Sequence, residues 1–303
     1  MSLTNRRNKL LLLKFFSLFS VVRGYNILII VLAQYLASIF ILAPALPARS
    51  ILFDLNLFLI VLATALAIAA GYIINGFYDS EKDLINRPLK TRLDHFISQK
   101  KILTLYFVLN LLSVIVSSYV SFKAVLFFSV YIFAIWFYSH KLKRLPFIGN
   151  LTSAILAITP FFAVFIYYGN FAEAIFVHAT FLFLIISMRE IVKDLENLKG
   201  DLALGYRTIP IVLGEFSAKW LITALVGLAI IPIYLLVTRF DIGLMDYYFY
   251  GSVILLLFFL GFLWFSKAQL HYLLLHNILK FIIVVGVFSI LLIDIHVVLD
   301  RIY

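Results

Sequence analysis

Long apolar stretches recur along the whole chain and constrain its fold more than any other feature. Crossing the hydrocarbon core of a bilayer takes about 20 residues of α-helix. Hydrophobic residues make up 64% of the 303 residues and charged residues 13%, whereas soluble domains average about 45–50% and about 25%. A soluble globular protein is therefore excluded, and we expect an all-α, polytopic membrane protein. The nine predicted helices cover residues 16–43, 55–78, 102–121, 124–138, 148–169, 172–192, 215–238, 245–266 and 277–299.

No linker rich in Gly, Ser or Pro interrupts this pattern, so we expect a single membrane domain over residues 1–303. The first apolar stretch is longer than the apolar region of a secretory signal, and no A-x-A cleavage site ends it, so we expect it to remain as a helix. Cysteine is absent, which excludes disulfides, thiolate metal sites and cysteine nucleophiles. The boundary between the third and fourth helices is predicted near residues 118–123.

Basic residues are concentrated in alternate loops. With a cytoplasmic N-terminus, the cytoplasmic segments hold 20 of the 25 Lys and Arg residues and the outer segments hold four. This asymmetry predicts an N-terminus inside and a C-terminus outside. We expect the membrane to be that of a prokaryotic cell. The net charge of +10 therefore points to topology and an anionic partner, and we expect no nucleic-acid partner. The predicted cytoplasmic segments are the basic N-terminus, 1–14, and two loops, 79–101 and 193–214.

Eight of the fifteen acidic residues follow only two helices, the second and the sixth. After the second helix, Asn75, Asp79 and Asp83 recur every four residues, which places them on one face if the helix continues. Oxygen-only ligands suit Mg²⁺, which completes its coordination with water and phosphate oxygens. The alternative is an acidic helix end solvated at the membrane surface.

The segment after the sixth helix repeats this pattern in its pairs Glu190/Asp194 and Asn197/Asp201. Carboxylates at a membrane edge are costly and are functional candidates by default. Two such clusters facing each other could hold two Mg²⁺ ions that bridge one diphosphate. The basic residues best placed by loop position to contact that diphosphate are Arg87, Lys141, Lys143 and Arg207, although each is alternatively a topology-setting cation.

These motifs resemble the UbiA-type superfamily of intramembrane prenyltransferases, over about residues 15–290. Asn75, Asp79 and Asp83 match its N-x-x-x-D-x-x-x-D motif, and Arg87 belongs to its D-x-x-N-R-P continuation. The second D-x-x-x-D motif falls on Asn197 and Asp201, so Asn replaces its first Asp, and the stretch after Pro88 departs from the family pattern. The run Arg-Glu-x-x-Lys-Asp-Leu-Glu from Arg189 is most similar to the geranylgeranylglycerol-phosphate geranylgeranyltransferase branch. Further positions that resemble the family are Arg23, Asn26, Tyr138, Lys141, Asn150 and Arg207.

The resemblance implies a nine-helix bundle around a central cavity that opens on the cytoplasmic side. It also implies Mg²⁺-dependent transfer of a prenyl group from a geranylgeranyl-type diphosphate to a membrane-soluble acceptor such as geranylgeranylglycerol phosphate. Alternatives are an aromatic quinone precursor as acceptor and, from another class, a cation-coupled secondary transporter. Membrane lipid is the expected environment, and no obligate protein partner is implied.

The resemblance also assigns roles to residues. Asp79, Asp83, Asp201 and Arg87 would be catalytic. The implied metal ligands are Asn75, Asp79 and Asp83 for one ion and Asp194, Asn197 and Asp201 for the other, with Glu190 as an alternative contributor to the second site. The implied substrate-binding residues are Arg23, Asn26, Tyr138, Lys141, Asn150 and Arg207.

Aromatic rings could shield and stabilise the allylic cation formed in such a reaction. Six of them are expected near the motifs: Tyr72, Phe77, Tyr78, Tyr138, Tyr168 and Tyr206. The six histidines show no metal-binding spacing, and we interpret them as loop or packing residues.

Overall fold

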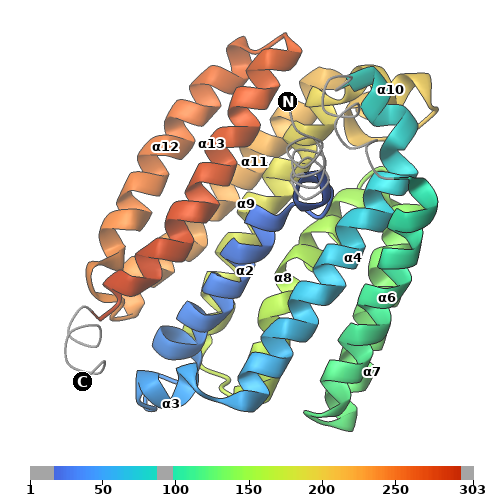
Figure 1. Ribbon diagram of the computed structural model, residues 1–303. Coiled ribbons are helices and arrows are strands. Elements are labelled where there is room, and N and C mark those ends of the chain that lie inside the picture. The colour runs from blue at the N-terminus through green and yellow to red at the C-terminus, as the bar shows by residue number, and fades with distance from the viewer. Residues whose placement is uncertain (1–16, 87–97, 295–303) are drawn as a thin grey trace, which may run out of the picture. The chain divides into compact units, whose positions relative to one another are not determined.

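The computed structural model describes residues 17–86 and 98–294. Within these ranges every regular element is a helix, and nine helices are long and apolar enough to cross a membrane. They match the nine predicted stretches in order, so the prediction of an all-α polytopic membrane protein is confirmed. The helices of spanning length are α2 (Gly24–Ala37) with its π-helical extension η1 (Ser38–Leu42), α4 (Leu55–Asn86), α6 (Gln99–Ser118), α7 (Phe122–His140), α8 (Ile148–Tyr168), α9 (Glu173–Glu196), α11 (Ile209–Arg239), α12 (Asp246–Phe265) and α13 (Gln269–Ser289) (Figure 1).

Several helices extend beyond the apolar stretches that predicted them. α4 continues eight residues past its predicted end at residue 78, and α11 begins at Ile209 instead of residue 215. α11 contains a break at Gly214, where φ is +83° and only glycine is unstrained. Short helices fill the connections: α3 (Ala48–Leu52), η2 (Leu142–Arg144), α10 (Leu198–Ala203), η3 (Gly243–Met245) and η4 (Ile290–Leu292).

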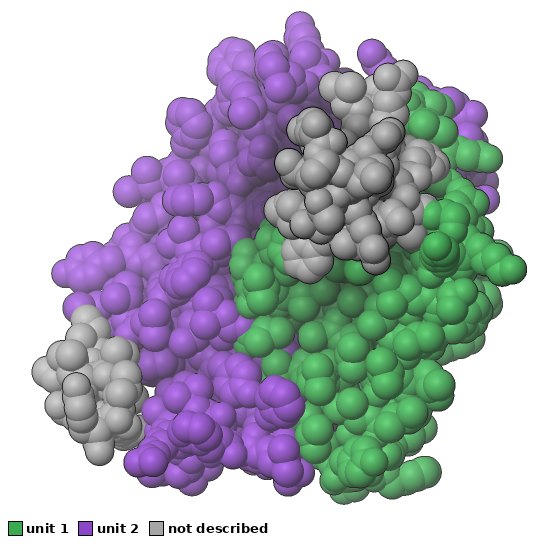
Figure 2. Space-filling view, in the orientation of Figure 1, with its two compact units in different colours: residues 1–31, 59–141 green, residues 32–58, 142–303 purple. Residues whose placement is uncertain are grey.

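The chain forms two compact units, shown in green and purple in Figure 2: Met1–Val31 with Leu59–Lys141, and Leu32–Phe58 with Leu142–Tyr303. In the first unit, Ala70, Ile73 and Ile74 of α4 form a buried cluster with Tyr106 of α6, and Ile135 of α7 packs against it. Ser113 Oγ of α6 also donates to the carbonyl of Ala63 at 2.8 Å. α4, α6 and α7 are therefore held together by apolar packing and a buried hydrogen bond.

The second unit is organised around α9, which packs against α8, α11 and α13, while α12 packs against α11 and α13. Ile185, Met188 and Val192 of α9 are fully buried. Gln34 is also fully buried, and its Nε2 donates to the carbonyl of Pro160 inside α8 at 2.8 Å. The end of this unit that carries Asp54 is fixed by Tyr167, whose hydroxyl donates to Asp54 Oδ2 at 2.7 Å.

Candidate active site

The first predicted metal segment lies on α4, which continues as a helix through Asn75, Asp79 and Asp83. The three side chains therefore share one face, as the four-residue spacing predicts. Asp79 is buried, and its Oδ1 lies 3.5 Å from Nζ of Lys82. A basic residue therefore lies beside the acidic face of α4, three residues after Asp79.

Arg23 and Asn26, two of the residues implied to bind substrate, both contact Tyr72 on α4. The guanidinium of Arg23 lies 5.1 Å from the centre of the Tyr72 ring, and Asn26 Nδ2 donates to the Tyr72 hydroxyl at 3.2 Å. Arg23 has a φ of +49° at the break between the helical residues 17–21 and α2. Tyr72 is three residues before Asn75, so this polar group adjoins the predicted metal face of α4.

The end of α7 contributes the next group of the first unit. Tyr138 is half-buried, and Lys141 is exposed at the C-terminal cap of α7. His140 Nδ1 lies 3.1 Å from the hydroxyl of Tyr78, which directly precedes Asp79. This contact attaches the end of α7 to the acidic part of α4. Arg87, predicted to be catalytic, lies outside the described residues.

In the second unit, Asp194 near the end of α9 meets Asn150 at the start of α8. Asn150 Nδ2 donates to Asp194 Oδ2 at 2.7 Å, so a residue implied to bind substrate also fixes the direction of a predicted metal ligand. Asn197 is the buried C-cap of α9, and Asp201 on α10 is 0% exposed. The structure thus brings Asn150, Asp194, Asn197 and Asp201 to one end of the second unit.

The segment after α10 is held by the turn η2. The backbone N–H of Arg207 donates to the carbonyl of Arg144 at 3.0 Å, and the Arg144 guanidinium lies 5.0 Å from the centre of the Tyr206 ring. Gly149 packs so closely on η2 that a Cβ would lie 2.9 Å from the Leu142 carbonyl oxygen. The Arg207 side chain is exposed, whereas Lys143 is buried.

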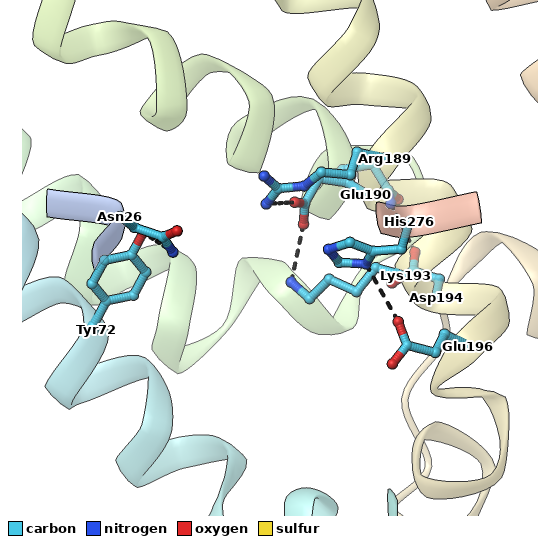
Figure 3. A network of polar contacts seen from close by, with 9 residues as sticks. Asn26, Tyr72, Arg189, Glu190, Lys193, Asp194, Glu196 and His276 are labelled. Carbon is cyan, nitrogen blue, oxygen red and sulfur yellow. Dashed lines mark hydrogen bonds and ion pairs between the residues drawn. The ribbon is translucent and has the colours of Figure 1, made fainter. Parts of the chain in front are cut away.

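A charged network follows on the same stretch of α9 (Figure 3). Glu190 is buried and accepts from Arg189 Nη2 and Lys193 Nζ, each at 3.1 Å. Glu196 Oε2 lies 3.3 Å from His276 Nδ1 of α13. Glu190 is therefore engaged by two cations, and His276 contacts a carboxylate, which the interpretation as a packing residue did not anticipate. The three- and four-residue spacing of Arg189, Lys193 and Glu196 places these charged residues on one side of α9, but it does not predict the contact with His276.

One expected aromatic residue lies elsewhere. Tyr168 ends α8, whereas Asn150 lies at its start, 18 residues away. At 1.5 Å per residue this separation is about 27 Å, so the expectation that Tyr168 lies near the motifs is wrong.

The predicted metal ligands of both units are carboxylate and amide side chains. Across 17–86 and 98–294, no three His, Asp or Glu side chains form a ready-made metal cage. Mg²⁺ does not need one, because it is commonly held by one or two carboxylates together with water and substrate phosphate oxygens. The predicted ligands of each unit all offer oxygen atoms, the donors that Mg²⁺ prefers, and Asp201 among them is fully buried. The donor sets therefore fit Mg²⁺ that is bound together with a phosphate-bearing substrate.

The second unit also contains an apolar pocket of about 140 Å³. Its wall includes Phe162 of α8, Ile185 of α9, Tyr248 of α12 and Gly286 of α13. On α9 the lining residues run from Ile175 to Ile185, which is about 28 to 14 Å along the helix axis from Asp194. Such a wall suits an apolar ligand.

Together, the fold and these polar helix ends define a multi-pass integral membrane protein with oxygen-rich sites suited to a divalent cation. The chain belongs to the UbiA prenyltransferase family, whose model matches residues 21–271. The resemblance found in the sequence is therefore confirmed.

Relatives include the digeranylgeranylglyceryl phosphate synthases of Pyrococcus furiosus and Methanobrevibacter smithii. The first is 33% identical over 177 residues, which span 58% of this chain and 63% of the relative. The second is 29% identical over 257 residues, which span 80% and 84%. The chain thus covers less than two thirds of the length of the Pyrococcus furiosus protein.

Solved structures share the fold. One, from work on digeranylgeranylglyceryl phosphate synthase in membranes, has a TM-score of 0.68 at 20% identity and covers 91% of this chain and 97% of its own. Another, a UbiA homologue from Archaeoglobus fulgidus bound to GPP and Mg²⁺, has a TM-score of 0.66 at 15% identity and covers 90% and 99%.

Proposed function

We propose that this protein catalyses the Mg²⁺-dependent transfer of a geranylgeranyl-type prenyl group from its diphosphate to a glycerol phosphate lipid such as geranylgeranylglycerol phosphate. The observation that carries the proposal is the oxygen-rich end of α9, where Asn150 orients Asp194 beside the buried Asn197 and Asp201. The relatives named digeranylgeranylglyceryl phosphate synthase support this acceptor over an aromatic quinone precursor.

In this reaction the bond between the allylic carbon and the diphosphate breaks, the acceptor hydroxyl oxygen bonds to that carbon, and the hydroxyl proton is released. Bound Mg²⁺ supplies neutralisation of the charge that develops on the leaving diphosphate. Asn75, Asp79 and Asp83 would hold one ion, and Asp194, Asn197 and Asp201 the other. Arg87, Lys141 and Arg207 would add fixed positive charge beside the diphosphate.

Other groups of the chain would bind and shield the substrate. Tyr72, with Arg23 and Asn26 bound to it, presents an aromatic ring one turn before Asn75. Ring faces of this kind stabilise positive charge. The apolar pocket of the second unit would receive part of the prenyl chain, since its lining offers hydrocarbon and aromatic side chains almost throughout.

We also propose that the N-terminus and the predicted active-site loops are cytoplasmic and that the C-terminus lies outside. The support is the distribution of Lys and Arg between alternate loops.

A screen of acceptors with the purified protein tests the proposed function. With geranylgeranyl diphosphate as donor, we expect the prenylated product, identified by mass, from geranylgeranylglycerol phosphate and not from aromatic acids. Asp79→Asn and Asp201→Asn should each lower turnover by about 100-fold or more, and removal of Mg²⁺ by a chelator should abolish it reversibly. Asp241→Asn, at an exposed loop residue, is the matched control. Unchanged turnover in both active-site variants would refute the metal assignment. Formation of a prenylated aromatic acid would refute the proposed acceptor and indicate an aromatic one.

A further inference from the structure

The cations of α9 lie beside the oxygen donors, and the proposed reaction leaves them without a role. Arg189, Lys193 and Glu196 are separated by four and three residues, and Glu190, Asp194 and Asn197 repeat this spacing one residue later. Since successive helical residues turn by about 100°, the two sets occupy neighbouring faces. The contacts agree, because Asp194 meets Asn150 of α8, whereas Glu196 meets His276 of α13.

Glu190 holds the two cations side by side. Its two carboxylate oxygens each accept from a different cation, Oε1 from Arg189 and Oε2 from Lys193, both at 3.1 Å (Figure 3). The Glu190 side chain is 6% exposed, whereas those of Arg189 and Lys193 are each 28% exposed. The carboxylate is therefore enclosed, while both cationic side chains are partly exposed.

Arg189 also keeps donor capacity. Its Nε is buried and makes no hydrogen bond to any residue that the structure describes. A guanidinium has five N–H donors in a rigid fork that matches phosphate geometry, and a lysine ammonium adds a mobile point charge. His276 lies within electrostatic range of Arg189 and adds a further nitrogen to this side of α9.

We propose that Arg189 and Lys193 bind the phosphate group of the acceptor lipid and that Glu190 is the residue that positions them. This inference rests on the proposed function. A phosphate monoester carries a charge of about −1.5 to −2 near pH 7, which calls for two cations. The donor diphosphate is assigned to Asp194 and Asn197 on the neighbouring face, together with Asp201 of α10, so the two phosphate groups would be bound next to each other at this end of α9. This arrangement would place the acceptor beside the bond that breaks.

The test compares two acceptors that differ only in the phosphate, geranylgeranylglycerol phosphate and geranylgeranylglycerol. The measured quantity is the ratio of their kcat/KM values. The wild-type protein should prefer the phosphorylated acceptor, and Arg189→Gln and Lys193→Gln should each lower the preference about tenfold or more, the effect expected for losing a hydrogen bond to a charged group. The KM for geranylgeranyl diphosphate should not change. Lys267→Gln removes an exposed charge at the turn between α12 and α13 and should leave the preference intact.

Conservative variants separate binding from folding. Arg189→Lys and Lys193→Arg keep the charge and should retain a measurable preference, and thermal unfolding in detergent shows whether each variant is folded. An equal loss with both acceptors, or a raised KM for the donor, would overturn the proposal. If the wild-type protein uses both acceptors equally well, the phosphate site is refuted and the proposed function stands. If it prenylates neither, the proposed function itself fails.

Discussion

At the scale of single residues, the bond between Asn150 and Asp194 shows how a neutral side chain can prepare a carboxylate for its ligand. Asn150 Nδ2 occupies one oxygen of Asp194 at 2.7 Å and thereby fixes the orientation of the carboxylate. Partners that orient a metal ligand contribute to metal affinity although they never touch the ion. Asn150 is therefore expected to act through Asp194.

Replacement of Asn150 by Ala tests this role. Loss of the hydrogen bond should raise the Mg²⁺ concentration needed for half-maximal activity by about 10- to 100-fold, the usual effect of removing such a partner. Asn170→Ala is the control, since Asn170 makes a comparable bond to the Leu42 carbonyl at the Asp54 end of the second unit. An unchanged Mg²⁺ requirement in Asn150→Ala, with a lower activity at all concentrations, would contradict the role.

Asn197 offers the opposite experiment. Asn197→Asp restores the aspartate of the family motif and adds one negative charge to the predicted second metal site. Because Mg²⁺ affinity rises with the number of charged oxygen ligands, the half-saturating Mg²⁺ concentration should fall. Titration of activity with Mg²⁺ measures this, and a higher requirement would show that position 197 does not face the ion.

The residues of the first motif, predicted from four-residue spacing, are ones that a helix itself brings onto one face. Asn75, Asp79 and Asp83 needed only the continuation of α4. The pairing of Asn150 with Asp194 and of His276 with Glu196 depends on contacts between helices far apart in sequence, which no local pattern encodes. The roles of these residues in the reaction remain predictions.

At the scale of helices, the packing of α12 against α13 depends on the absence of a side chain at Gly286. A Cβ there would lie 2.5 Å from the hydroxyl oxygen of Tyr248, which donates to the Ile282 carbonyl at 3.0 Å. Both residues line the apolar pocket, so this contact shapes the wall assigned to the prenyl chain.

Gly286→Ala should therefore lower the stability of the protein by about 1–3 kcal/mol through overpacking. Gly251→Ala is the matched control, because a Cβ at this position of α12 meets nothing within 4 Å, and it should be neutral or stabilising. Thermal unfolding in detergent compares the two. Tyr248→Phe in the Gly286→Ala background removes the closest atom, the Tyr248 hydroxyl oxygen, and should recover part of the lost stability. If no stability is recovered, the overpacking does not arise at the Tyr248 hydroxyl.

Helix number and order could be predicted because spanning length is a strong constraint, whereas helix ends could not. Hydropathy ends a helix at its first polar residues, but α4 and α13 carry polar residues within continuous helix. The polar end of α4 carries Asp79 and Asp83. Hydropathy does not predict this end as helix, whereas the four-residue spacing of the acidic residues does.

At the scale of the whole molecule, the distribution of charge predicts which loops face the cytoplasm. The natural absence of cysteine makes this directly testable, since any introduced thiol is unique. Lys267→Cys and Asp241→Cys place one thiol at an exposed residue of two different loops. A membrane-impermeant maleimide should label the Asp241 variant in intact cells and the Lys267 variant only after permeabilisation. The reverse pattern would invert the topology.

The division of the chain into two compact units neither confirms nor contradicts the prediction of a single membrane domain, which stays a prediction. The predicted metal ligands are divided between the units, with Asn75, Asp79 and Asp83 in one and Asp194, Asn197 and Asp201 in the other. A reaction that uses both sets needs both units.

Helix α9 separates the residues of the proposed metal site from the residues of the apolar pocket. The helix carries Asp194 near one end and pocket residues from Ile175 to Ile185 towards the other, and its rise of 1.5 Å per residue keeps their spacing constant. Substitutions in the pocket wall could therefore change the length of hydrocarbon that is accommodated without moving the carboxylates. Product range and chemical step could then evolve independently along a single helix.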